Sequence, residues 1–156
     1  MTVKVVRFTE SDWRAFAVIR LRALVDALGE RDPQYQKEAA FTAAQWRRRL
    51  RNHAQFATLI DGRPVGLIAA QQENPDSVYL YSLWLDPAVR GRGLARPLVA
   101  AAVDWARDEH VQTVTLRVES GNLAARAVYE SLGFALVAAA QTAEPRDEVA
   151  MMLSVS

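Results

Sequence analysis

Short apolar segments alternate with longer amphipathic ones along the chain, and the short segments predict strands. Seven of them have the length of strands, and several carry the β-branched and aromatic side chains that favour sheets. They are residues 3–8, 55–60, 64–72, 78–85, 111–118, 134–140 and 147–155. The Asp61-Gly62 pair between the second and third segments predicts a hairpin turn. We expect the last strand to lie at an edge of the sheet.

Apolar residues at helical spacing predict four helices. They cover residues 11–28, residues 43–54, a long segment that begins near Leu94, and residues 122–133. Shared apolar faces are expected for Ala17, Leu21, Leu24 and Leu28 in the first helix and for Leu94, Leu98, Ala101 and Trp105 in the third. Thr42 and Asn122 are suited to cap helix starts, and Gly29 and Gly133 are suited to follow helix ends. The polar, proline-containing residues 29–40 predict a loop.

The order of these elements, β-α-α-β-β-β-α-β-α-β-β, predicts an α/β (α+β) protein. Its single mixed layer of about six to seven strands would be flanked by about four helices. The chain shows no internal repeat, low-complexity tract or linker. We therefore expect a single domain over residues 1–156.

Composition narrows the classes of function. The chain has 156 residues, of which 51% are hydrophobic and 24% charged, which is typical of a folded domain with a core. Its net charge of +1 gives no reason to expect nucleic acid or a membrane, so any anion site must be local. With no cysteine and two histidines, disulfides, a cysteine nucleophile and a metal site are not expected. No leader or membrane span is visible, and a cytoplasmic protein is expected.

An unusual cluster of cations precedes the third helix. Arg90, Arg92 and Arg96 surround Gly91 and Gly93, although a helix N-terminus carries partial positive charge and prefers acidic residues. Free amides of a first turn, glycines that admit a ligand close to the backbone, and arginines together suit a phosphate group. A solvated basic turn is the alternative. A Walker loop is excluded, because Leu94-Ala95 stand where lysine and Ser/Thr are needed.

Two segments carry a family resemblance. The sequence Arg90-Gly-Arg-Gly-Leu-Ala95, after a strand ending in Leu83-Trp-Leu-Asp-Pro87, resembles the (Arg/Gln)-x-x-Gly-x-(Gly/Ala) motif of the GNAT superfamily of N-acetyltransferases. Residues 122–134, with Asn122, Tyr129 and Gly133-Phe134, are similar to the second signature of that family. The resemblance is strongest from about Val78 to Ala138. It implies the GNAT fold, with a mostly antiparallel sheet.

The resemblance implies acetyl-CoA (coenzyme A) as the cofactor, with no metal. The family binds the pyrophosphate at a loop that corresponds here to Arg90, Gly91, Arg92, Gly93, Leu94, Ala95 and Arg96. Pro97 biases Arg96 away from helical angles, which makes Arg96 the least secure of these contacts. The pantetheine arm would pair with the backbone of Leu83, Trp84 and Leu85. Asn122 would contact the arm or adjacent backbone, or simply cap its helix.

Tyr129 is the catalytic residue that the resemblance implies. Its phenol, with an ordinary pKa near 10, would act as general acid for the departing thiolate, and a core tyrosine is the alternative. The backbone amide of Leu85 is the candidate donor to the carbonyl oxygen in the transition state. The general base that takes the proton from the amine is not assigned by the resemblance, because many relatives have a carboxylate at the position of Tyr81 or Ser82 and this chain does not.

Other groups remain as candidates for the base. Glu119 is the first alternative, Glu73 and Glu38 are weaker ones, and a water chain ordered by Tyr81 and Ser82 is equally possible. The family therefore suggests an acetyl-CoA-dependent N-acetyltransferase in which an amine attacks the thioester directly.

The expected partner is a small-molecule or peptide amine, with no nucleic acid and no membrane. In the basic stretch 45–53, Trp46 and Leu50 are expected to face the core while the arginines form a solvated helix face, so no aromatic side chain is expected to stack on bases. Residues 29–41 could lie over the acceptor site. We expect a monomer or a homodimer. The alternative function is a GNAT-like module that binds acyl-CoA as a sensor without turnover.

Overall fold

The computed structural model describes residues 1–137 and 148–156. Its strands are β1 (Val3–Arg7), β2 (Ala54–Ile60), β3 (Arg63–Asn74), β4 (Ser77–Leu85), β5 (Thr113–Glu119), β6 (Ala135–Leu136) and β7 (Glu148–Ser154). The α-helices are α1 (Trp13–Leu28), α2 (Pro33–Ala39), α3 (Ala43–Asn52), α4 (Ala95–Asp108) and α5 (Leu123–Ser131). Short 3-10 turns, η1 (Glu10–Asp12) and η2 (Pro87–Val89), precede α1 and follow β4. The mixed α/β fold predicted from the sequence is confirmed.

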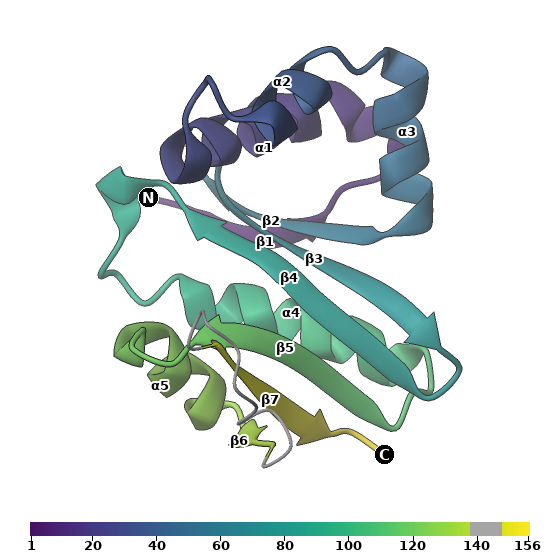
Figure 1. The fold of residues 1–156 in the computed structure, drawn as a ribbon, viewed down its shortest axis with the longest axis vertical. Helices are drawn as coiled ribbons and strands as arrows, with labels where there is room; N and C mark the ends of the chain where they lie inside the picture. Colours follow the sequence, from purple (N-terminus) through teal and green to yellow (C-terminus); the bar gives the residue numbers. More distant parts are fainter. Residues whose placement is uncertain (138–147) are drawn as a thin grey trace.

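One sheet of seven strands, in the order β1-β2-β3-β4-β5-β7-β6, runs through the molecule (Figure 1). All neighbouring strands pair antiparallel except β4 and β5, which are parallel. Two predictions for the end of the chain need correction. The last strand, β7, is not at an edge, because β6 pairs with its outer side. The predicted strand 134–140 contributes β6 alone, and residues 138–140 lie outside the described residues.

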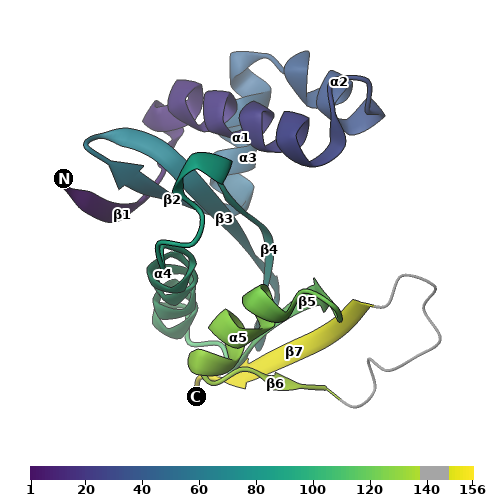
Figure 2. The ribbon, with the colours of Figure 1, turned by 90° about the vertical axis from the view of Figure 1, so that its left-hand side faces the viewer.

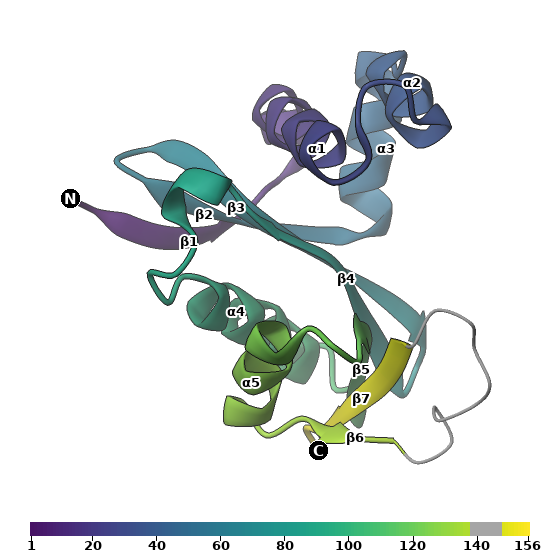
Figure 3. The ribbon, with the colours of Figure 1, turned by 60° about the vertical axis from the view of Figure 1, so that its left-hand side comes forward.

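The helices cover opposite faces of the sheet. Figures 2 and 3 show α1, α2 and α3 on one face and α4 and α5 on the other. Each face has its own buried cluster of apolar side chains. Phe16, Ile19 and Trp46 belong to the cluster under α1–α3, whereas Leu98 and Tyr129 belong to the cluster under α4 and α5.

The predicted loop 29–40 was wrong, because it contains the helix α2. Asp32 accepts a hydrogen bond from the Gln34 amide (2.8 Å), and Pro33 occupies the first helical position, where its missing N–H costs nothing. The Asp-Pro pair was therefore a helix start rather than a turn. The buried side of α2 is the carboxylate of Glu38, and for this reason the segment showed no apolar stripe.

Two predicted helix faces were misplaced by part of a turn. In α4 the buried residues are Leu98, Val99, Ala102, Val103 and Ala106, so of the predicted stripe Leu98 alone is fully buried. In α1, Ala17 and Leu24 are buried, but Leu28 is 48% exposed. The predicted capping roles fared better. Thr42 forms a capping box with Gln45, and Asn122 caps α5.

Candidate active site

A cleft opens in the sheet where its two parallel strands separate. β4 pairs with β5 over three residues, Ser77–Tyr79, and the strands then diverge (Figure 1). On its other side β4 pairs with β3 through a bulge, because Ser82 and Leu83 lie between the paired residues Tyr81 and Trp84. Ser82 has a φ of 58°, which is an uncommon conformation for a residue other than glycine. The backbone of β4 beyond Tyr79 therefore has no strand partner on the β5 side in the described chain.

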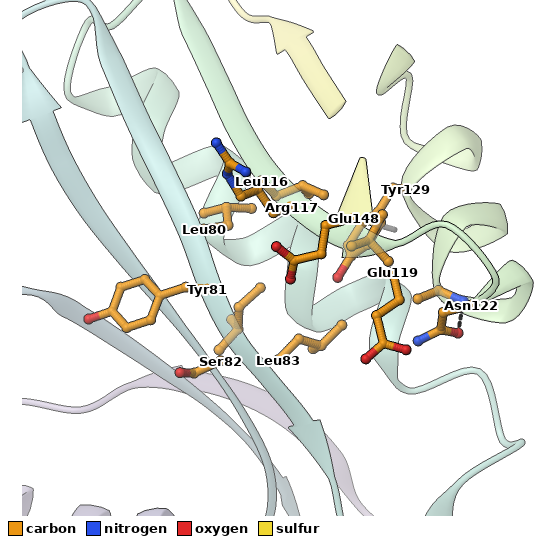
Figure 4. Close-up of a pocket in the computed structure, with 13 residues that line it drawn as sticks. Leu80, Tyr81, Ser82, Leu83, Leu116, Arg117, Glu119, Asn122, Tyr129 and Glu148 are labelled. Atoms are coloured by element: carbon orange, nitrogen blue, oxygen red, sulfur yellow. Dashed lines mark hydrogen bonds between the residues drawn. The ribbon is translucent and has the colours of Figure 1, made fainter. Parts of the chain in front are cut away.

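Side chains from β3, β4, β5, α5 and β7 line the cleft, which has a volume of about 330 Å³. β3 contributes Ile68, β4 contributes Leu80, Tyr81, Ser82 and Leu83, β5 contributes Leu116, Arg117, Val118 and Glu119, α5 and its N-cap contribute Asn122, Ala125 and Tyr129, and β7 contributes Glu148. Figure 4 shows the Tyr129 hydroxyl and the Glu119 and Glu148 carboxylates directed toward the space beside Leu83. The cleft thus gathers groups that the sequence separates by more than sixty residues.

Tyr129 is buried in the wall of this cleft. Its ring is 6% exposed and contacts Phe134 edge on, with the ring centroids 5.9 Å apart. Burial raises the pKa of Tyr129 to about 12, so its phenol keeps its proton throughout the physiological range. Its hydroxyl makes no hydrogen bond with another described residue. Tyr129 is therefore a core residue whose protonated hydroxyl also faces the cleft. The two interpretations from the sequence, a core tyrosine and a proton donor, are compatible.

The acidic residues of the cleft lie near its mouth. Glu119 ends β5 and is paired in register with Glu148 of β7, so two carboxylates lie side by side on the sheet. Glu119 is exposed and Glu148 is half-buried. Asn122 uses its side-chain oxygen to accept a hydrogen bond from the Ala125 amide (3.2 Å), which leaves its amide group pointing away from the helix (Figure 4).

The loop between β4 and α4 has the conformation that its glycines predict. Gly91 and Gly93 have φ values of 80° and 75°, and a Cβ atom added to either would meet no atom within 4 Å. The surface above them is thus open to a ligand. α4 begins at Ala95, and no described side chain caps its first turn, so free amides face the loop. Pro97 occupies the third helical position, where it removes one amide but does not delay the helix start.

The arginines of this loop do not all face outward. Arg90 donates to the Leu85 carbonyl (2.9 Å) and forms an ion pair with Asp26 of α1 (2.8 Å). Arg96 donates to the Ser131 hydroxyl (3.1 Å), while the exposed Arg92 has no hydrogen-bond or ion-pair partner among the described residues. Two of the three arginines therefore tie the loop to α1 and α5.

The same contacts fix the end of β4. Trp84 donates its indole N–H to Asp26 (2.9 Å), and this hydrogen bond, followed by that of Arg90, holds the pKa of Asp26 below its ordinary value. The side chains of Leu83 and Leu85 instead pack on the α4–α5 side. Because adjacent side chains of the strand are anchored on opposite faces, the backbone between them is fixed at the edge of the cleft.

Sequence reasoning missed a buried polar cluster beside the bulge. Glu38 of α2, 3% exposed, forms an ion pair with Arg20 of α1 (3.0 Å) and a longer one with Arg49 (3.5 Å). Arg20 also donates to the hydroxyl of Ser82 (3.2 Å). Burial raises the pKa of Glu38, but its hydrogen bonds and charge contacts, chiefly with Arg20, outweigh burial and lower it overall. The one sign of this cluster in the sequence is Arg20, a charged residue that falls on the buried face of α1 together with Ala17 and Leu24.

A second missed pair joins the same side of the cleft. Nδ1 of His53 is hydrogen-bonded to the phenol of Tyr81. The two residues are 28 positions apart in the sequence, so no local pattern indicates this contact. Glu73, the third carboxylate considered as a base, is exposed and does not line the cleft.

The described residues also limit other kinds of site. They bring together no group of three histidine, cysteine or acidic residues that could hold a metal ion. Within residues 1–137 and 148–156, every helix is too short or too polar to traverse a bilayer.

Comparison with known sequences identifies relatives for most of the chain. A model of the acetyltransferase (GNAT) family matches residues 13–134. The mycothiol acetyltransferase of Nocardiopsis dassonvillei is 36% identical over 100 residues, which are 64% of this chain and 26% of the relative. The N-acetylaspartate synthetase of Xenopus tropicalis is 31% identical over 80 residues, 51% of this chain and 30% of the relative. The chain thus spans less than a third of the length of these curated relatives.

Solved structures resemble the fold over its whole length. A putative acetyltransferase from Salmonella typhimurium, solved with its cofactor acetyl-CoA, has a TM-score of 0.74 at 20% identity and covers 100% of this chain and 95% of its own. The PaiA N-acetyltransferase of Thermoplasma acidophilum, in complex with coenzyme A, gives 0.73 at 12% identity with 99% of both chains covered. The ribosomal-protein-S18-alanine N-acetyltransferase of Escherichia coli gives 0.70 at 23% identity, over 99% of this chain and 95% of its own.

Proposed function

The chain belongs to the acetyltransferase (GNAT) family, and from this premise we propose that it transfers the acetyl group of acetyl-CoA to a primary amine. The observation that carries the proposal is the cleft between β4 and β5, which Leu83, Asn122 and Tyr129 line and which lies along the strand that leads into the open glycine loop. When bound, acetyl-CoA supplies the activated acetyl group. The acceptor is an amine of a small molecule or of a peptide.

The residues at the loop fit a diphosphate. Gly91 and Gly93 leave the backbone open, and the uncapped first turn of α4 offers its amides. Arg92 has no partner in the described part of the chain and is the arginine available to pair with a phosphate group, whereas Arg90 holds the loop against Asp26. Leu94, Ala95 and Arg96 follow the loop at the start of α4, where Arg96 donates to the Ser131 hydroxyl. We therefore assign phosphate binding mainly to backbone amides and Arg92.

The unpaired edge of β4 fits an extended chain of amides. The backbone of Leu83, Trp84 and Leu85 has no strand partner toward β5 in the described residues, so an amide-bearing arm can add to the sheet there as a strand would. Asn122 faces the opposite wall of the cleft. Its free side-chain amide nitrogen is suited to donate to a carbonyl of that arm.

We assign Tyr129 the role of hydrogen-bond donor to the departing sulfur. A thiol has an ordinary pKa near 8.5, and the pKa of Tyr129 is about 12. Handing its proton fully to a thiolate would therefore cost about 5 kcal/mol. A donated hydrogen bond has no such cost and still stabilises the negative charge that develops on sulfur. Tyr129 thus supports departure without becoming a phenolate.

Glu119 and Glu148 suit recruitment of the acceptor. Two adjacent carboxylates at the mouth of the cleft favour a cationic ammonium group over a neutral or anionic one. The expectation from sequence that Glu119 is the base stays a prediction.

The proposal is tested by a panel of amines with detection of the free thiol of coenzyme A. The panel includes aspartate and a peptide with N-terminal alanine, since the names of two relatives contain these groups. Acetyl-CoA should raise the melting temperature of the protein, and at least one amine should release thiol faster than water does. A shift without release from any amine would favour the acyl-CoA sensor instead. Absence of both would refute the proposal.

A further inference from the structure

A histidine–tyrosine pair connects the cleft to a second cavity. Tyr81 lines the cleft, and its phenol is hydrogen-bonded to Nδ1 of His53. His53 follows the last residue of α3 and lines a separate cavity of about 260 Å³. The rings of His53 and Tyr81 meet edge on with centroids 5.6 Å apart, and the ring of Tyr79 stacks on that of Tyr81 with centroids 6.0 Å apart. The phenol is thus held in place between the two cavities.

The pair lies on the face of the sheet opposite Tyr129. Val78 and Leu80 are buried in the cluster under α4 and α5, so the alternating residues Tyr79 and Tyr81 face the side of α1–α3. In Figure 4 the Tyr81 hydroxyl points away from Tyr129. If Tyr129 lies beside the departing sulfur, the amine attacks from the other face of the sheet, on the side of α1–α3. Tyr81 borders that face.

The surroundings of His53 favour its neutral form. Burial, and after it the positive charge of Arg49, lower the pKa of His53 below its ordinary value of 6.5. Arg48 of α3 and Lys37 of α2 line the same second cavity, and Glu38 offsets part of their charge through its ion pair with Arg49. A neutral imidazole that accepts at Nδ1 carries its proton on Nε2. The neighbouring cations then favour release of any proton that reaches the ring.

We propose that His53, acting through Tyr81, takes up the proton that the acceptor amine must lose; this deepens the proposed function and rests on it. One ammonium N–H bond breaks, and its proton bonds to the Tyr81 oxygen while the phenolic proton bonds to Nδ1 of His53. The amine nitrogen keeps the electron pair and becomes the nucleophile. The phenol is restored, the imidazolium releases its Nε2 proton to water in the second cavity, and exchange with that water moves the remaining proton from Nδ1 back to Nε2 before the next turnover.

The pair of His53 and Tyr81 supplies a base where the sequence has no carboxylate. A carboxylate is absent at Tyr81 and Ser82, and Glu38 is held in ion pairs with Arg20 and Arg49. Burial raises the pKa of Tyr81, so a free phenolate is unfavourable and the two proton transfers proceed together. His53 therefore does not contact the amine itself. It positions the phenol of Tyr81 and accepts the proton that the phenol passes on.

One test needs no turnover. The chain has two histidines, so the ring nitrogens of His53 can be assigned by NMR with His110→Asn as the reference. We expect the Nε2–H tautomer. Tyr81→Phe should raise the pKa of His53 by about 0.5–1, since a hydrogen bond donated to the neutral ring is lost. A proton on Nδ1, or a pKa unchanged by Tyr81→Phe, would overturn the proposal even if no acceptor were known.

The kinetic test uses the pH dependence of kcat/KM with an amine from the panel. The wild-type rate should rise through a pKa below 6.5 and then level off. His53→Gln should lower the rate at pH 7 about 10²-fold and replace the plateau by a rise that continues with pH. Added imidazole should restore part of the rate in His53→Ala. The double variant Tyr81→Phe with His53→Gln should be no slower than the slower single variant, because both act in one pathway.

Matched controls separate this proposal from the proposed function. His110→Asn replaces an exposed histidine with positive φ by another residue that tolerates it, and it should keep the wild-type profile. Glu119→Gln should lower kcat/KM at every pH, because it weakens recruitment of the amine, and should still keep the plateau in the profile. If Glu119→Gln removes the plateau and His53→Gln keeps it, the relay is wrong while the acetyltransferase stands. If the wild type releases no thiol, the proposed function fails. The NMR experiment then still tests whether His53 accepts a hydrogen bond from Tyr81.

Discussion

Replacing Glu38 by glutamine tests whether a buried ion pair supports the bulge of β4. The carboxylate is 3% exposed and receives hydrogen bonds from Nε and Nη2 of Arg20 at 3.0 and 3.2 Å. Arg20 is 8% exposed and also holds the hydroxyl of Ser82. Glutamine keeps the shape of the side chain but removes its charge. Arg20 then remains buried without a counter-ion, close to Arg49.

The expected loss follows from the burial of the partner. Breaking a buried ion pair by removing one member costs about 3–5 kcal/mol, because the remaining charge stays desolvated. Total stabilities of domains are about 5–15 kcal/mol, so Glu38→Gln should remove a large part of the stability. For a chain of this length, the melting temperature should fall by roughly 6–20 °C. Loosening of Ser82 should also weaken the thermal shift caused by acetyl-CoA.

Urea unfolding at pH 7 measures the loss, with Glu30→Gln as control. Glu30 is an exposed glutamate in the turn before α2, and its replacement should change the unfolding free energy by less than about 0.5 kcal/mol. Adding Arg20→Gln to Glu38→Gln should recover stability, since no uncompensated charge remains. A loss below about 1 kcal/mol for Glu38→Gln, or no recovery in the double variant, would refute the reasoning.

The pH dependence has a definite sign. The pKa of Glu38 is lower in the folded protein than its ordinary value of 4.5. Its contribution to stability is therefore fully present above about pH 4.5 and is lost as the pH falls toward the folded pKa. The difference in unfolding free energy between wild type and Glu38→Gln should shrink in that acidic range. A constant difference would mean that the carboxylate is not charged in the folded state.

Three further predictions concern the cofactor, the chemistry and the sheet. Gly93→Asp should abolish the thermal shift with acetyl-CoA, because it adds a negative charge and a side chain at a φ of 75°, whereas Gly62→Asp in the hairpin turn should keep the shift. Tyr129→Phe should slow thiol release at least about tenfold with little change in that shift; an unchanged rate would leave Tyr129 a packing residue. Gly66→Ala should cost about 1–3 kcal/mol in urea unfolding, because its Cβ would lie 2.5 Å from Cδ2 of Leu85, and a neutral result would show that Leu85 can move aside.

Much of the fold was encoded locally. The strands and the hairpin at Asp61-Gly62 came from short-range patterns, and the caps at Thr42 and Asn122 are single side chains that bond to the next turn of backbone. The glycines of the loop predicted an unusual backbone, and Gly91 and Gly93 do have positive φ. Such features depend on a few neighbouring residues, and for that reason sequence can reveal them.

The tertiary structure decided how distant residues meet. Where β4 leaves β5 depends on the whole sheet, and this divergence places Tyr129 opposite Leu83. The helix α2 was missed because its buried residue is Glu38, whose charge is compensated by arginines of α1 and α3 and not by anything nearby in sequence. The ion-pair partner of Arg90, Asp26, is also distant in the sequence.

The sequence by itself determined the family, the position of the glycine loop and the absence of a carboxylate at positions 81 and 82 of β4. Only the tertiary structure brought His53 to Tyr81, because α3 and β4 approach each other through the packing of three helices on one face of the sheet. Proton transfer requires that donor and acceptor lie within hydrogen-bond distance in space. Residues that are brought together only by folding, such as His53 and Tyr81, show no common pattern in the sequence.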